Sequence, residues 1–257
     1  MWLIFAYRKI SFSPYKKYLA SLFNHILFLK QHFDIVFPQE VSKKKWLQVS
    51  LCFDYASADF YQTILPFLIK HNIKAILGIS CRYIVDKITC DLNKRLFVPD
   101  GLATLDNIFI QQQPFCSWEE LLDIKKSQLI DFASHGFSIR NLKNNPNYLS
   151  KEINLSKITL ETKLQQPIKH FIYPLGITDD LASKLVHKTY EYSFLLGNAI
   201  NKNNCKHSLY RINITNTETL NNSLFLKNFI TFIKNACFHR AKKLFTQKRL
   251  THPLNDI

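Results

Sequence analysis

The feature that most constrains the fold is a regular alternation of short apolar runs with longer amphipathic stretches. Runs rich in β-branched and aromatic residues are typical of strands, and apolar residues at every third or fourth position are typical of helices. The predicted strands are 2–7, 33–37, 47–53, 74–79, 129–134, 168–173, 192–196 and 209–214. The predicted helices are 15–32, 59–71, 117–127, 148–164, 179–190 and 224–249. Alternation over the whole chain predicts parallel strands enclosed by helices, and this many units suits a closed α/β barrel.

The composition is that of an ordinary globular protein. The chain has 257 residues, a length that is enough for one large domain with a core. Hydrophobic residues make up 47% of it and charged residues 21%. No glycine-rich nucleotide-binding motif is present, so a nucleotide fold has no local support. The six cysteines form no CxxC pair and lie mostly in apolar contexts, which indicates reduced, buried thiols and a cytoplasmic location.

Positive charge is concentrated at the two ends of the chain. The 34 basic and 19 acidic residues leave a net charge of +15, and most of the excess lies in 1–50 and 223–257. One interpretation is a lysine-rich composition without function. The other is a basic face that contacts anionic lipid or a polyanion. No recognisable motif favours nucleic acid. The candidate contact residues are Lys234, Arg240, Lys242, Lys243, Lys248 and Arg249.

Three polar segments follow predicted strands. Asp54 ends the strand 47–53, His135 ends the strand 129–134, and Tyr173 ends the strand 168–173. In a parallel barrel the carboxyl ends of the strands share one rim, where functional residues gather. The sequence therefore predicts that Asp54, His135 and Tyr173 surround one mouth.

The same segments resemble the ordered motifs of a known family. "CFDYA" at 52–56, "ASHGFSIRNL" at 133–142 and "HFIYPLG" at 170–176 are similar to the TFDDG, SHxxxH and FxYPxG motifs of polysaccharide deacetylases. These are the NodB-homology enzymes of carbohydrate esterase family 4. The resemblance implies a distorted (β/α) barrel over 1–214, and the remainder, 215–257, is expected to be a basic amphipathic helical extension. It also implies hydrolysis of N-acetyl groups on a glycan, with one divalent metal such as zinc.

The resemblance assigns a role to each matching residue. Asp54 matches the family's catalytic base, and His135 matches one of three metal ligands. Tyr55 and Ile139 stand where the other two ligands are expected, so zinc binding is expected to be weak or absent. Arg8 stands where the family carries a histidine near the N-terminus. The expected substrate-binding residues are Tyr55, Phe137, Tyr173 and Gly176.

Three functional hypotheses remain open from the sequence. The first is an active deacetylase with replacement ligands, for which Asp59 and His170 are the nearest candidates. The second is a non-catalytic relative that binds a glycan or a partner protein through its rim, with Tyr55 and Phe137 stacking on sugar rings. The third is a peripheral protein at the cytoplasmic face of the inner membrane, which brings the rim to a lipid-linked sugar.

Overall fold

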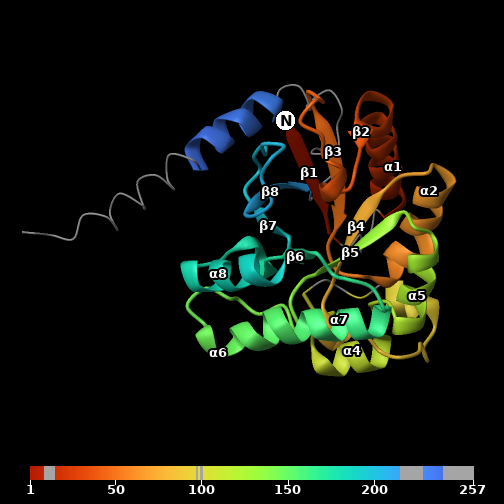
Figure 1. Ribbon diagram of the computed structural model, residues 1–257. Coiled ribbons are helices and arrows are strands. Elements are labelled where there is room, and N and C mark those ends of the chain that lie inside the picture. The colour runs from red at the N-terminus through yellow and green to blue at the C-terminus, as the bar shows by residue number, and fades with distance from the viewer. Residues whose placement is uncertain (9–14, 97, 99–100, 215–227, 240–257) are drawn as a thin grey trace, which may run out of the picture.

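The structure is a computed structural model that describes residues 1–8, 15–96, 98, 101–214 and 228–239 (Figure 1). Its centre is one sheet of eight strands, and all of them except β2 close into a parallel ring. The strands of the ring are β1 (Trp2–Tyr7), β3 (Gln48–Phe53), β4 (Ala75–Ile79), β5 (Ile130–Ser134), β6 (His170–Ile172), β7 (Tyr192–Leu196) and β8 (Leu209–Ile214). The ring closes because β1 pairs with both β3 and β8. The predicted barrel is confirmed.

The short strand β2 (Asp34–Ile35) lies outside the ring because it shares one edge of β3 with β4. It pairs with the first residues of β3, at Gln48, whereas β4 pairs with the last residues, at Cys52. The predicted strand 33–37 therefore shrinks to two residues.

Strand residues alternate between the inside of the barrel and the layer beneath the helices. In β1, Trp2 and Ile4 belong to the inner cluster, and Phe5 and Tyr7 belong to the outer one. Both faces of such a strand are covered, so all six residues of β1 are buried, which explains its continuous apolar run. This alternation fixes which side chains reach the mouth.

The outer layer consists of helices that match the predicted stretches. They are α1 (Tyr15–His32), α2 (Leu65–Lys70), α5 (Trp118–Lys126), α6 (Pro146–Leu149), α7 (Ser156–Leu164) and α8 (Asp180–Thr189). A π-helical turn precedes α2, at Phe60–Ile64, and another joins α6 to α7, at Ser150–Leu155. The helix α5 begins with a capping box, in which Ser117 and Glu120 each accept the other's backbone N–H.

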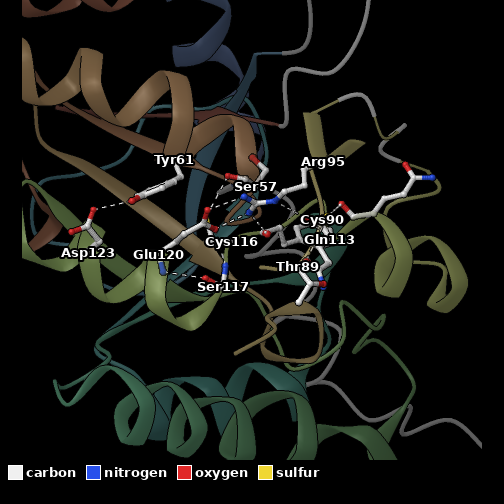
Figure 2. A network of polar contacts seen from close by, with 12 residues as sticks. Ser57, Tyr61, Thr89, Cys90, Arg95, Gln113, Cys116, Ser117, Glu120 and Asp123 are labelled. Atoms are coloured by element: carbon white, nitrogen blue, oxygen red, sulfur yellow. Dashed lines mark hydrogen bonds and ion pairs between the residues drawn. The ribbon is translucent and has the colours of Figure 1, made fainter. Parts of the chain in front are cut away.

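The segment 80–116, which joins β4 to α5, contains the short helices α3 (Leu92–Leu96) and α4 (Asp106–Gln112). Figure 2 shows the polar contacts that fix it. Arg95 is 3% exposed and donates to both carboxylate oxygens of Glu120, at 2.8 and 2.7 Å. It also donates to the carbonyl oxygens of Gln113 and Phe115, each at 3.0 Å. One buried guanidinium therefore ties this segment to the start of α5.

We expect Arg95→Met to lower the free energy of unfolding by about 2–3 kcal/mol, because it leaves a carboxylate that is only 12% exposed and two carbonyls without their donor. Thermal unfolding measures the loss. The matched control is Lys94→Gln, a change at the exposed neighbouring residue. Equal stability of the two variants would mean that this network does not hold the segment.

The extension after β8 is described only over 228–239, which forms a helix. Its residues Phe232 and Ala236 are buried against the barrel. In Figure 1 this helix lies beside the N-terminal end of β1. None of the described helices has the length and apolar character needed to cross a membrane. The division at residue 214 stays a prediction.

Candidate functional site

Asp54 lies at the end of β3, and its carboxylate points into the barrel. It continues the inward alternation of Ser50 and Cys52, and its N–H donates to the Tyr7 carbonyl at 2.8 Å. The side chain is only 3% exposed. A carboxylate this deeply buried requires a charged or hydrogen-bonding partner.

That partner is Arg211, which reaches the same point from β8. Its guanidinium forms an ion pair with the Asp54 carboxylate and lies 3.3 Å from Cys52 Sγ. Burial alone would raise the pKa of Asp54, but Arg211, His135 and Arg8 together hold it below its usual value. The Asp54 carboxylate is therefore ionised, and the Arg211 guanidinium balances its charge inside the protein. Arg211 was not among the residues predicted for the site, although its position in 209–214 puts an arginine on the barrel-facing side of a strand.

His135 follows β5 and lies beside this pair. Its N–H donates to the Ile79 carbonyl at 2.8 Å, and its Nδ1 has no hydrogen-bond partner among the described residues. Burial, Arg211 and Arg8 lower its pKa to about 4, against the raising effect of Asp54. The Tyr55 ring lies against the imidazole, with 4.9 Å between the ring centroids. His135 is thus a neutral imidazole with an aromatic neighbour.

The loop after His135 is fixed by a buried carboxylate. Glu152, 0% exposed, accepts the Ser138 N–H at 3.1 and 3.0 Å and also the Ser138 hydroxyl. Gly136 has a φ of +76°, and a Cβ there would lie 2.5 Å from Glu152 Oε2, so glycine is needed for this approach. The hydrogen bonds between Ser138 and Glu152 set the position of Ile139, the next residue in the loop.

Tyr55 and Ile139 line the same cavity, of about 310 Å³. Tyr83 and Phe115 add two more rings to its wall, with centroids 5.6 Å apart, and Arg8 adds a cation. Two positions separated in sequence thus meet at one place, next to His135. The backbone at both is left-handed, with φ of +59° at Tyr55 and +61° at Ile139. A β-branched residue in that conformation is strained.

Three of the expected substrate-binding residues lie elsewhere. Tyr173 is 0% exposed and packs edge-on against Phe171 in the layer beneath the helices, because Ile172 takes the inward position. The Phe137 ring lies under the Lys151 ammonium. Gly176 approaches the Leu196 side chain so closely that a Cβ would meet it at 2.6 Å. From this motif, the residue that reaches the cavity is Leu175.

The two candidate replacement ligands do not join His135 in a metal-binding group. His170 Nε2 is hydrogen-bonded to Asp131 at 2.9 Å, near the start of β5. Asp59 is buried at the start of the helical stretch after β3. Over the described ranges, no three His, Cys, Asp or Glu side chains are grouped to hold a metal. A phenol ring and a sec-butyl group beside one imidazole do not fit a tightly held divalent ion.

The fold and the site define a class: an α/β barrel whose polar groups sit at the carboxyl ends of its strands, as in barrel enzymes. The sequence model of the polysaccharide deacetylase family matches residues 42–194. The chain therefore belongs to the polysaccharide deacetylase family, which confirms the resemblance.

Solved structures show the same fold. The Streptococcus pyogenes deacetylase PplD is 20% identical, with a TM-score of 0.64 over 85% of this chain and 95% of that one. A de-N-acetylase from Aggregatibacter actinomycetemcomitans is 19% identical, with a TM-score of 0.65 over 89% and 99%. IcaB from Ammonifex degensii is 15% identical, with a TM-score of 0.63 over 85% and 93%. No curated protein matches the chain.

Proposed function

We propose that this chain binds a glycan at the mouth of the barrel without hydrolysing it. The family acts on polysaccharides, which supplies the class of ligand. The observation that carries the proposal is that Tyr55 and Ile139 line the cavity beside His135. Where the family's motifs supply metal ligands, this chain supplies an aromatic ring and an aliphatic side chain.

The chemistry of the cavity supports binding rather than hydrolysis. Metal-dependent hydrolysis of an amide needs an ion that polarises the carbonyl and lowers the pKa of a bound water. The donor set here does not fit such an ion, and Arg211 already occupies the carboxylate of Asp54. The cavity instead offers the rings of Tyr55, Tyr83 and Phe115, which can pack on the apolar faces of sugar rings. Its volume lies at the lower end of the range for ligand sites and suits a short glycan segment.

We expect Tyr55→Asn to weaken binding of N-acetylated oligosaccharides such as chitotriose by about tenfold, the contribution of one aromatic contact. Asparagine accepts the left-handed backbone at this position, so the variant should remain folded. Isothermal titration calorimetry measures the affinity. The matched control is Tyr148→Asn, the same change at an exposed tyrosine on α6.

Two outcomes separate this proposal from its alternatives. Release of acetate from chitotriose by the purified chain would establish an active deacetylase with an altered site. Absence of binding to any N-acetylated oligosaccharide would favour a rim that binds a partner protein.

The finer expectations from the sequence stay proposals. A cell-envelope or lipid-linked glycan is the proposed ligand class, and the cytoplasmic face of the inner membrane is the proposed location. All six cysteines are free thiols in the structure. Of the six basic residues expected to contact a membrane, Lys234 lies on the helix 228–239. The others, Arg240, Lys242, Lys243, Lys248 and Arg249, lie outside the described residues.

A further inference from the structure

The N-terminal end of the barrel carries a second hollow, of about 830 Å³, which the proposed glycan site does not use. Its walls come from the loop before β3, the loop between β7 and β8, and the helix 228–239. The side chain of Asn203 donates to the Ser42 carbonyl at 2.8 Å and to the Lys45 carbonyl at 3.2 Å. These bonds hold the two loops together. We call this region the basal surface and define it by Lys43, Lys44, Lys45, Trp46, Lys202 and Ile233.

The basal surface is basic. It presents four lysines, and all four are exposed. No aspartate or glutamate is among the described residues that line the hollow. Lys45 forms an ion pair with Asp34 at 3.2 Å, whose two side chains remain largely in solvent. The surface therefore attracts a ligand that carries several negative charges.

The basal surface also exposes large apolar side chains to solvent. The Trp46 side chain is 69% exposed, and its ring lies 6.1 Å from that of Phe229 on the helix 228–239. On the same helix Ile233 is 41% exposed and Ile230 is 60% exposed. These apolar groups lie next to the lysines. An exposed tryptophan beside lysines is typical of proteins that lie in the interface of a membrane.

We propose that the basal surface docks on an anionic lipid bilayer. Lysines would contact the headgroup phosphates, while Trp46 and Ile233 would enter the interface. Charge argues against two other occupants. A second copy of the chain would bring like charges together. The segment 240–257, which has five basic residues and one acidic residue, would do the same.

The position of the basal surface fixes the orientation of the docked protein. The surface lies where the strands of the barrel begin, and Asp54, Tyr55 and His135 lie where they end. Docking therefore directs the mouth away from the bilayer. This orientation is opposite to the one expected from the sequence, in which membrane contact brings the rim to a lipid-linked sugar. A glycan bound at the mouth would then come from solution or from a long chain that reaches past the barrel.

Tryptophan fluorescence provides a direct test, because Trp46 is the exposed one of the chain's three tryptophans. Trp2 is 0% exposed and Trp118 is 8% exposed, so they give a constant background. Equimolar phosphatidylcholine and phosphatidylglycerol vesicles should shift the emission to shorter wavelength, and vesicles of phosphatidylcholine alone should not. Raising the ionic strength from about 0.1 M to about 1 M shortens the Debye length from about 10 Å to about 3 Å and should remove the shift.

Charge variants connect the shift to this surface. Each basic residue near an anionic membrane contributes about fivefold to partitioning. Lys43→Gln, Lys44→Gln and Lys45→Gln together should therefore weaken co-sedimentation with the mixed vesicles by about 100-fold. The matched control changes three exposed lysines outside the basal surface, Lys87→Gln, Lys184→Gln and Lys188→Gln, and should retain most of the binding.

Five outcomes would overturn the proposal. Three of these are no binding to the mixed vesicles at low salt, an equal loss in the control variant, and binding without an emission shift. The fourth is the same shift with free glycerol phosphate at equal phosphate concentration, which would indicate a site for soluble phosphates. The fifth is an emission shift that follows protein concentration without vesicles, which would indicate a second copy. Glycan binding by the same preparations reports separately on the mouth.

Discussion

Arg211→Met is expected to lower the free energy of unfolding by about 3–5 kcal/mol, because it leaves the Asp54 carboxylate buried without its counter-charge. In a domain of this size, such a loss corresponds to a fall of about 6–20 °C in Tm. Thermal and urea unfolding measure it. If the stability of Arg211→Met equals that of the wild type, the ion pair is not what neutralises Asp54.

A second variant separates the loss of the pair from loss of packing. Asp54→Leu with Arg211→Met replaces both charges by apolar groups, and exchanges of this kind are often neutral or stabilising. The double variant should therefore recover most of the stability that either single variant loses. If it is less stable than Arg211→Met, packing around β8 rather than charge explains the effect.

The pH dependence of the same variants has a definite sign. The folded-state pKa of Asp54 lies below its ordinary value of 3.8. The stability that the pair contributes is therefore present above pH 3.8 and is lost as the pH falls through the lower folded-state value. Without Arg211, burial dominates and raises the pKa of Asp54. The difference in stability between the wild type and Arg211→Met should then shrink as the pH is lowered.

Tyr55→Asp combined with Ile139→His is expected to create a zinc site that the wild type lacks. Both positions line one cavity, and Tyr55 already touches His135. The left-handed backbone at both positions suits aspartate and histidine better than tyrosine and isoleucine. Groups that only hydrogen-bond to a metal ligand change affinity by about 10–100-fold, so two added ligands should raise it by more than about 100-fold. Titration with zinc or cobalt measures the affinity.

The matched control is Tyr55→Asn with Ile139→Gln, which has similar shape and poor ligands. One-to-one binding of zinc by the wild type would mean that the chain has a further metal ligand, one not found beside His135 among the described residues. If the folded double variant binds zinc no more tightly than the control, the loops do not hold positions 55 and 139 where their side chains can meet one ion. In that case Arg8 is the first cause to examine, because its cation lines the same cavity; Arg8→His would remove most of that charge at neutral pH.

The sequence predicted the barrel because both faces of its strands are buried. The strands 192–196 and 209–214 and the helix 15–32 have the predicted bounds. The strand 33–37 is shorter than predicted, because β4 pairs with the second half of the β3 edge. The local sequence gives no sign that β2 and β4 share one edge of β3.

The candidate site could be predicted where the alternation of side chains along a strand is enough to place a residue. Asp54 and His135 continue the inward alternation of their strands, so the rule that places them at the mouth holds. The same alternation puts Tyr173 on the outside. The buried carboxylate of Glu152 could not be inferred, because its partner lies in a loop fourteen residues earlier. Arg211 has a local signal, but its partner is 157 residues away.

The closure of the ring has a consequence for biogenesis. Among the strands of the ring, β1 is synthesised before the others, but its second neighbour, β8, ends at Ile214. Until then one edge of β1 offers unpaired N–H and C=O groups, the kind of edge that promotes aggregation. Contacts this distant in sequence also slow folding. Since β8 carries Arg211 to Asp54, a nascent chain completes its charge pair in the same step that closes its barrel. Chaperone dependence during synthesis should therefore end with the last strand.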